Sequence, residues 1–230
     1  CSSDLTAARS LALLNAKTKE EAARLAGDLT ALNQSRKALT EKGKEEAIRI
    51  IETTELKNDR VLVVYLPDCH ESLAGIIAGR IREKYHRPAF VLTGGETSAK
   101  GSGRSIESYS MYEELVKCAD LMIQFGGHPM AAGLSIEEKN IEEFRRRLNV
   151  NCTLTDEELR PKIVIDVPMH VSYITKELVE QISLLEPFGK GNTKPVFAQK
   201  KLRVLDHSII GKNKNVVKLK LLDRKSTRLN

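Results

Sequence analysis

The sequence lacks the features that mark a zinc finger, a disulfide scaffold or a membrane protein. Its four cysteines, Cys1, Cys69, Cys118 and Cys152, are widely spaced and form no Cys-x-x-Cys pair. No apolar run approaches the roughly 18 residues of a membrane helix, and we find no signal peptide. These absences exclude the three classes, and a cytoplasmic location fits the cysteine usage best.

Catalytic motifs are equally scarce. The sequence contains no Asp-His-His, Asp-x-Asp, His-x-x-x-Asp or His-Glu-x-x-His string, and its nine aspartates are scattered. A two-metal hydrolase needs carboxylates and histidines that converge on ions about 3.5–4 Å apart. We expect no metal site in this chain, and the residues alone indicate a protein that binds phosphates but does not cut them.

Positive charge is concentrated at one end of the chain. From Gly189 to Asn230 there are 12 Lys and Arg against two Asp, whereas the first 188 residues hold 25 basic and 29 acidic residues. A basic C-terminal segment indicates a polyanion such as nucleic acid. A solvated lysine-rich surface would have the same composition, so charge alone leaves both interpretations open.

Both ends of the sequence carry a separate expectation. The first residue is Cys1 and not Met, so we expect the chain to begin inside a longer gene product. The string "DRKSTRLN" at 223–230 resembles the translated read-through of a sequencing adapter. We treat it as a non-native tail and exclude it from reasoning about the fold.

The pattern of apolar residues predicts an α/β protein. A helix over 5–14 is followed by a capping-box pattern at Thr18, which opens a helix of roughly 35 residues. Strands and helices then alternate over 58–150 around a glycine loop near 101–105. A polar linker over 151–160 leads to a β-rich segment, 161–222, with a strand at 162–167, a helix at 175–185, and strands at 196–205 and 216–222.

The glycine loop "GSGRS" predicts anion binding. Glycines let a ligand approach the backbone N–H groups, and Ser102, Ser105 and the Arg104 fork could join them on a phosphate. The string lacks the Lys-Ser/Thr ending of a P-loop. Taken alone, the string is better explained by a glycine-rich hairpin with Arg104 in a surface ion pair.

A second string, "FGGHPMAAG", places His128 at the end of a predicted strand, where ligands collect in α/β units. His128 could donate a hydrogen bond to a phosphate oxygen or act as an acid; a packed structural histidine is the alternative. His70, which precedes a helix, and Arg80 are weaker candidates. His86, His170 and His207 have no partners at metal-ligand spacing and are interpreted as structural.

Several strings occur in one order, and together they resemble the RecJ exonucleases of the DHH phosphoesterase superfamily. They are "HESLAGIIAGRI", "RPAFVL", "GSGRS", "FGGHPMAAGLS" and "LEPFGKGNTKPVF". The resemblance covers about 5–222. It implies a metal-dependent 5′-to-3′ exonuclease on single-stranded DNA, acting in repair and recombination. Single-stranded-DNA-binding protein and helicases are the protein partners that such an activity suggests.

The resemblance also implies a domain plan. Residues 1–16 would end a catalytic DHH domain, 17–57 would be a long connecting helix, 58–150 a mixed-sheet DHH-associated domain, and 161–222 a truncated OB-fold. The divalent metal, Mn or Mg, would be bound by a domain absent from this sequence. We therefore expect the fragment alone to be inactive.

Site residues follow from the resemblance by position. His128 would be catalytic. Phosphate would be bound by Ser102, Gly103, Arg104, Ser105, Gly126, Gly127, His70 and Arg80. Single-stranded DNA would be bound by Lys200, Lys201, Arg203, Lys212, Lys214, Lys218 and Lys220. Only Tyr173, Phe188 and Phe197 could add base stacking there.

Two other functions remain open from the sequence. A DHH-type phosphoesterase could act on short oligonucleotides or cyclic dinucleotides, although it would not need a strand-tracking basic segment. A non-catalytic nucleic-acid-binding module is the second alternative.

Overall fold

The computed structural model describes residues 2–211 and 214–222. The chain divides into two compact units, Cys1–Pro161 and Lys162–Asn230, which are described separately below. Within the described residues, no helix is both long enough and apolar enough to cross a membrane. The segment 223–230, which we interpret from the sequence as a non-native tail, lies outside the described part of the chain.

The first unit opens with two helices, α1 (Ser2–Leu14) and α2 (Lys19–Thr53). Thr18 caps α2, because its hydroxyl accepts a hydrogen bond from the N–H of Glu21 at 3.1 Å. This is the bond that a capping-box threonine makes. The long helix predicted from the sequence is confirmed over 35 residues.

Helix α2 contains two glycines, Gly27 and Gly43, and Gly43 lies where the helix packs against its neighbour. A Cβ on Gly43 would lie 2.6 Å from Cδ1 of Ile77, which belongs to α3 (Glu71–Tyr85). Glycine thus lets the two helices approach closely. The buried side chains of α2 near this crossing include Ala47 and Ile51, which pack with α3 against the sheet.

A five-stranded mixed sheet forms the centre of the first unit, in the order β1-β2-β3-β5-β4. The first two strands are parallel, and every other pair is antiparallel. The strands are β1 (Leu62–Leu66), β2 (Ala89–Thr93), β3 (Ala99–Arg104), β4 (Met122–His128) and β5 (Ala131–Ile136).

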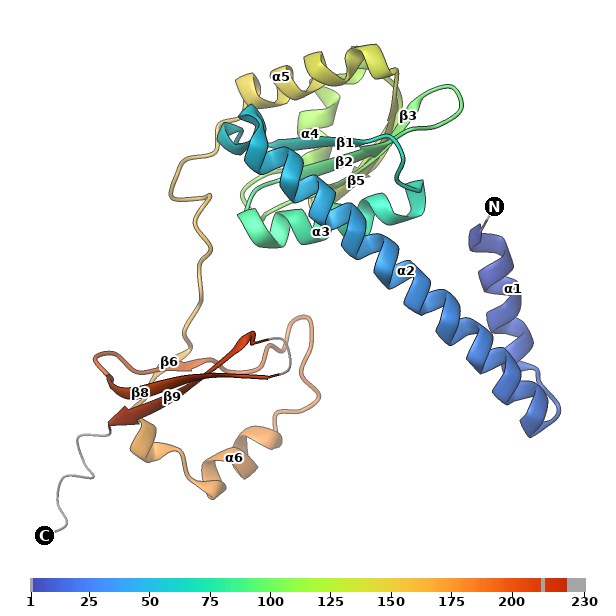
Figure 1. The fold of residues 1–230 in the computed structure, drawn as a ribbon. Helices are drawn as coiled ribbons and strands as arrows, with labels where there is room; N and C mark the ends of the chain where they lie inside the picture. The colour runs from blue at the N-terminus through green and yellow to red at the C-terminus, as the bar shows by residue number, and fades with distance from the viewer. Residues whose placement is uncertain (1, 212–213, 223–230) are drawn as a thin grey trace, which may run out of the picture. The chain divides into compact units, whose positions relative to one another are not determined.

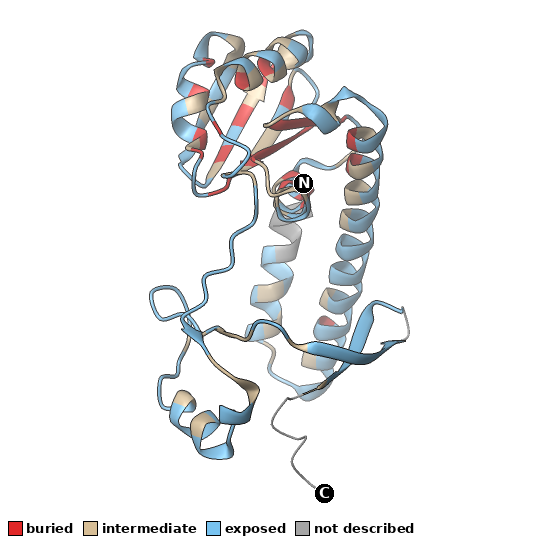
Figure 2. Ribbon diagram, turned by 90° about the vertical axis from the view of Figure 1, so that its left-hand side faces the viewer, coloured by how far each residue is buried: buried red, intermediate tan, exposed pale blue. Residues whose placement is uncertain are grey.

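Helices cover both faces of this sheet. Helices α2 and α3 lie on one face, and α4 (Met111–Val116) and α5 (Ile141–Asn151) lie on the other (Figure 1). Figure 2 shows that the buried residues gather between these layers. Three short 3₁₀ helices complete the unit: η1 (Glu55–Asn58), η2 (Ala119–Leu121) and η3 (Glu138–Asn140).

The predicted glycine loop is wrong, because residues 99–104 form β3 in the middle of the sheet. Its glycines face a crowded core. A Cβ on Gly103 would lie 2.4 Å from Sδ of Met111 and 2.6 Å from a ring carbon of Phe90. Local glycine content indicated a loop, but the close packing of α4 and β2 requires glycine in this strand.

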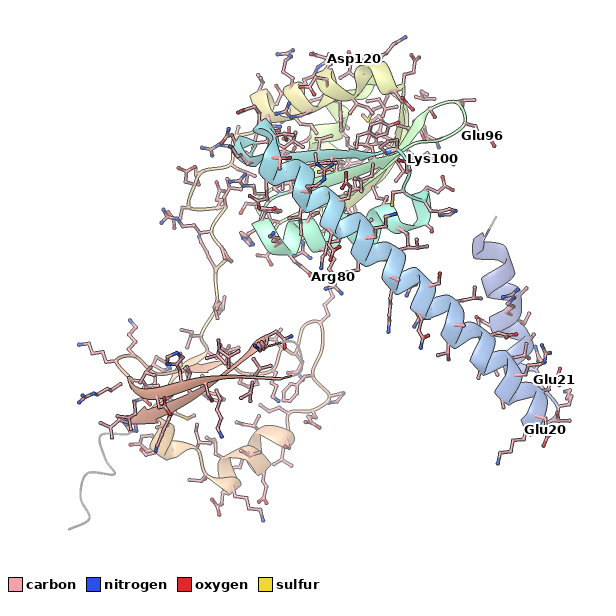
Figure 3. All side chains as sticks on the ribbon, in the orientation of Figure 1. Glu20, Glu21, Arg80, Glu96, Lys100 and Asp120 are labelled. Atoms are coloured by element: carbon pink, nitrogen blue, oxygen red, sulfur yellow. The ribbon has the colours of Figure 1, made fainter. Side chains whose placement is uncertain are left out.

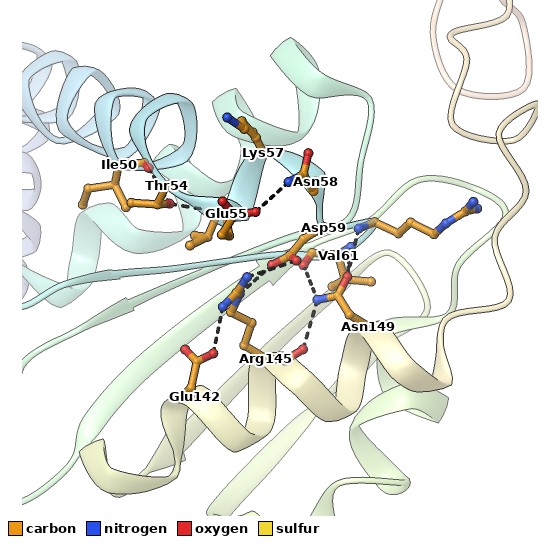
Figure 4. A network of polar contacts seen from close by, with 12 residues as sticks. Ile50, Thr54, Glu55, Lys57, Asn58, Asp59, Val61, Glu142, Arg145 and Asn149 are labelled. Carbon is orange, nitrogen blue, oxygen red and sulfur yellow. Dashed lines mark hydrogen bonds and ion pairs between the residues drawn. The ribbon is translucent and has the colours of Figure 1, made fainter.

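Hydrogen bonds of polar side chains connect the residues just before β1 to α5 (Figure 4). The Arg145 guanidinium forms two bonds to the Asp59 carboxylate, at 2.6 and 3.1 Å. The Asn149 side chain accepts hydrogen bonds from the N–H of Arg60 and of Val61, at 2.9 and 3.0 Å. These contacts, nearly 90 residues apart in sequence, fix the edge of the sheet against α5.

Part of the segment predicted as a polar linker packs on the first unit. Leu154 is buried with the core residues of β1 and α5. Arg60 donates to the carbonyl oxygen of Leu154 and forms an ion pair with Asp156 at 2.8 Å. The polar composition of this segment concealed Leu154, which is buried, and Leu159, which is partly buried against the same core.

The second unit is less compact. Its elements are β6 (Val167–Pro168), η4 (Val171–Tyr173), α6 (Lys176–Ser183), β7 (Phe197–Ala198), β8 (Arg203–Ile210) and β9 (Val216–Leu222). Strands β6 and β7 form a parallel pair, and β8 and β9 form an antiparallel hairpin. No described residue of this unit is buried (Figure 2).

Two strand predictions in this unit are too long. The strand expected at 162–167 is limited to Val167–Pro168. The strand expected at 196–205 is divided into β7 and the start of β8, with Lys201 at φ 60° between them. A left-handed residue cannot continue a pleated strand, and alternating hydrophobicity does not reveal such a break.

Candidate phosphate-binding site

The two glycine-containing stretches meet at one end of the sheet. Arg104 in β3 lies opposite Ala131 in β5, and on the other side of β5 the same alanine lies opposite His128 in β4. Directly opposite residues in antiparallel strands share a face of the sheet. Arg104 and His128 are therefore on one face, with a single strand of small residues between them.

Arg104 is half-buried against α3. Its Nη1 donates to the carbonyl oxygen of Gly103 at 2.8 Å. A Cβ on Gly75 of α3 would lie only 2.7 Å from Nη2 of Arg104, so glycine makes room for the guanidinium. Among the described residues no carboxylate forms an ion pair with Arg104. A partly desolvated guanidinium without an acidic partner is suited to bind an anion.

His128 lies at the exposed end of the edge strand β4. Its Nδ1 accepts a hydrogen bond from the N–H of Met130 at 3.2 Å. In the neutral ring this bond places the proton on Nε2, which can then donate to a ligand. The turn after His128 is held in place, because the carbonyl oxygens of Pro129 and Met130 accept bonds from Met111 and Ser105.

The two glycines before His128 differ in whether the fold requires a glycine at their position. Gly127 has φ +154°, and a Cβ there would lie 2.4 Å from the carbonyl oxygen of Ala131. The turn therefore requires glycine at 127. At Gly126 a Cβ would meet no atom within 4 Å. The fold does not require glycine at 126, where the missing side chain leaves the backbone open to a ligand.

Small residues line this face from Gly126 across β5, and we call this row of small residues the floor. Gly133 lies directly opposite Gly126, and both are exposed. On its other side Gly133 lies opposite Ser102 of β3. Helix α3 packs on β2 and β3, against Ser102 and Arg104, whereas Gly126 and Gly133 farther along the same face are exposed.

A pocket of about 330 Å³ adjoins this floor at the start of α3. It is lined by His70, Glu71, Ser72, Ala74, Lys100, Gly101, Ser102 and Leu134. The Nδ1 of His70 accepts a bond from the N–H of Ser72 at 3.2 Å. His70 thus caps α3 and also lines the pocket, which accords with its predicted position beside the site.

Four of the predicted residues do not join this face, and one of them is Gly127, which shares a row of the sheet with Gly103 through Ala132. Ser105 is buried, and its hydroxyl donates to the carbonyl oxygen of Tyr109 at 2.5 Å. A side chain at Gly103 would point into the core on the other face of the sheet. Arg80 lies on the exposed side of α3 and pairs with Glu83 at 3.0 Å (Figure 3). A sequence string does not show which of its residues face inward, whereas the strand assignment does.

The sequence reasoning also missed two residues of this face, Lys100 and Gly133. Residues 100, 102 and 104 alternate along β3 and share one face of the sheet. That alternation was visible in the string "KGSGR", but the loop interpretation hid it. Gly133 had no signal beyond its place in "MAAG".

The described residues of the predicted strand-binding set fall into two groups. Arg203, Lys218 and Lys220 share one face of the β8–β9 hairpin, with Asp206 opposite Lys220. Lys200, Lys201 and Lys214 lie in the connecting turns. Lys212 lies outside the described residues. The hairpin therefore gathers part of the predicted strand-binding set on one surface.

The described residues do not fit a divalent metal. They contain no group of three or more His, Cys, Asp or Glu side chains that could hold one. Catalytic metals in proteins need several such ligands, so we derive no chemical step through a metal in this chain.

Comparisons with known proteins agree with this architecture. A family model described as the DHHA1 domain matches residues 58–152, and one described as the RecJ OB domain matches residues 165–230. The first match covers the sheet that carries Arg104 and His128, and the second covers the basic hairpin.

Similar full-length proteins share one name. The single-stranded-DNA-specific exonuclease RecJ of Bacillus subtilis is 34% identical over 218 residues, which is 93% of this chain and 28% of that protein. RecJ of Escherichia coli is 35% identical over 211 residues, covering 87% of this chain and 36% of that protein. The chain thus spans about a third of the length of these relatives.

Solved structures point the same way. RecJ from Thermus thermophilus in complex with Mg²⁺ has a TM-score of 0.71 at 27% identity, covering 94% of this chain and 33% of that one. The Mn²⁺ complex of RecJ from the same organism has a TM-score of 0.72. With a DHHA1 domain followed by a RecJ OB domain, and with RecJ proteins matched over most of its length, the chain belongs to the RecJ family.

Proposed function

We propose that this chain is the phosphate- and strand-binding part of a metal-dependent 5′-to-3′ exonuclease on single-stranded DNA. One observation carries the proposal: a half-buried Arg104, which pairs with no carboxylate of the described residues, shares a sheet face with the exposed His128. The curated relatives named above are single-stranded-DNA-specific exonucleases.

Each group on this face has a part in the proposed reaction. The Arg104 guanidinium and the Ser102 hydroxyl bind a phosphate at or near the 5′ end. The open backbone at Gly126 lets the strand approach the sheet closely. His128 donates a hydrogen bond from Nε2–H to an oxygen of the scissile phosphate and stabilises the charge that develops there.

The metal belongs to another part of the proposed enzyme. Mg²⁺ and Mn²⁺ are named in the Thermus thermophilus RecJ structures, and the described residues here contain no matching ligand set. We infer that the ligands lie in a segment outside this chain. On this basis the 230-residue chain binds DNA without hydrolysing it.

The basic hairpin gives the proposed preference for single strands. Arg203, Lys218 and Lys220 lie on one face of it, where successive phosphates of a flexible strand can reach them. Such an enzyme would meet single-stranded-DNA-binding protein and helicases in the cytoplasm. A phosphoesterase for cyclic dinucleotides is less well supported, because it would not need this surface.

The test uses the longer protein that contains this chain. Single-stranded and duplex 20-mers, labelled at the 3′ end, are incubated with Mg²⁺ or Mn²⁺. The proposal predicts stepwise shortening of the single strand from its 5′ end, with the duplex degraded far more slowly. Equal degradation of both substrates, or shortening from the 3′ end, would refute it.

A further inference from the structure

The pocket at the start of α3 contains a cation that the proposed mechanism does not use. Lys100 lies two residues before Ser102 on the same face of β3, so the two side chains point to the same side of the sheet. Both line the pocket of about 330 Å³. Ser102 also belongs to the Arg104 face, and the pocket is therefore continuous with the proposed phosphate site.

Lys100 has an acidic partner that can be exchanged. Its Nζ lies 2.7 Å from Oε2 of Glu71, and the two side chains are 55% and 51% exposed. The hydrogen bond from Lys100 lowers the pKa of Glu71, so that carboxylate is ionised at neutral pH. An ion pair this exposed contributes little to stability. A ligand phosphate can therefore replace the carboxylate at small cost.

We propose that this pocket is a second phosphate subsite, in which Lys100 binds a phosphodiester of the strand held by Arg104. Glu71 competes with that phosphodiester for Lys100 and lowers the affinity of the subsite. The Ser72 and Ser102 hydroxyls, which line the same pocket, supply hydrogen-bond donors. The source of the phosphate, a single DNA strand, rests on the proposed function.

Geometry sets the spacing of the two subsites. Four residues of extended strand separate Lys100 from Arg104, a distance of about 13 Å between their Cα atoms. A mononucleotide bound at Arg104 cannot reach Lys100 as well, whereas a short oligonucleotide can. The effect of Lys100 must therefore depend on the length of the ligand.

The test measures binding of the 230-residue chain to 5′-phosphorylated tetrathymidylate and to thymidine 5′-monophosphate, over a range of salt concentrations. Lys100→Met is expected to weaken tetranucleotide binding about fivefold and to reduce the salt slope by about 0.7, the value for one phosphate contact on a single strand. Mononucleotide binding should not change. Glu71→Gln is expected to tighten tetranucleotide binding about threefold.

Lys117→Met is the matched control, because Lys117 pairs with Glu114 at 2.6 Å and is 50% exposed, but belongs to the helix on the opposite face. If Lys100→Met behaves like Lys117→Met, or if Glu71→Gln weakens binding, the subsite is refuted. Arg104→Ala separates the two proposals. If it abolishes binding while Lys100→Met has no effect, only the subsite fails. If it has no effect while Lys100→Met weakens binding, the subsite stands and the Arg104 site fails.

Discussion

At the scale of single residues, the adjacent glycines 126 and 127 separate a functional requirement from a structural one. Gly127 has a positive φ and no room for a Cβ, whereas Gly126 has neither constraint. A sequence shows two identical letters here. Only the backbone geometry shows that one glycine is needed by the turn and that the other leaves an open surface.

This difference predicts that alanine at 127 affects stability, whereas alanine at 126 affects DNA binding. Gly127→Ala should lower the free energy of unfolding by about 1–3 kcal/mol, because alanine is strained at this φ and meets the backbone of β5. Gly126→Ala should change it by less than about 0.5 kcal/mol while weakening binding of single-stranded DNA. Urea unfolding and fluorescence anisotropy measure the two effects. A destabilising Gly126→Ala would contradict the open-floor interpretation.

His128 is expected to act on turnover more than on binding. In the longer protein, His128→Asn removes the Nε2 donor and should lower kcat by about a hundredfold, the lower end for a lost hydrogen-bond donor to the transition state. KM should change little, because Arg104 and the basic hairpin provide most of the binding. Single-turnover kinetics separates these effects. An increase in KM at constant kcat would instead assign His128 to binding.

At the scale of helices and strands, the sequence predicted elements well where their signal is local. The Thr18 cap, the long helix and the strand before Gly-Gly-His follow from capping and periodicity. Strand β3 was mistaken for a loop because Gly103 is required by its close packing against Phe90 and Met111, which the string itself does not reveal. Arg104 and His128 were identified, but their common face required the strand register.

The contact between α5 and the start of β1 is predicted to stabilise the first unit. Arg145 and Asp59 are only 20% and 14% exposed and form two bonds. Arg145→Ala should therefore cost about 2–3 kcal/mol, since it leaves a largely buried carboxylate without its partner. Arg146 of the same helix is 60% exposed and pairs with Glu143. Arg146→Ala should change the melting temperature little, because an ion pair this exposed contributes little to stability. Equal losses in thermal unfolding would refute the difference.

At the scale of the whole chain, the two units contribute differently. The first has a core on each face of its sheet, whereas no described residue of the second is buried. The second unit is also the basic one, since nine of the 34 residues from Gly189 to Leu222 are Lys or Arg and one is Asp. Its role in the proposed function is electrostatic.

Binding to single-stranded DNA is therefore predicted to be strongly dependent on salt. The logarithm of the association constant should fall against log salt with a slope of about −0.7 per phosphate neutralised. The double variant Lys218→Met, Lys220→Met should reduce the slope by about 1.4. Anisotropy titrations at several salt concentrations measure it. A slope near zero in the unmodified chain would contradict the electrostatic role of the second unit in DNA binding.

The central claim is that Arg104 binds a phosphate of the strand, and a comparison of two arginines tests it most directly. Arg80→Ala is the control, because Arg80 is exposed, pairs with Glu83 and belongs to the same unit. The dissociation constant of the chain for a 5′-phosphorylated single-stranded oligonucleotide is measured for both variants. Arg104→Ala should weaken binding at least tenfold, or about 1.4 kcal/mol, while Arg80→Ala leaves it unchanged. Equal affinities for the two variants would contradict the proposed site.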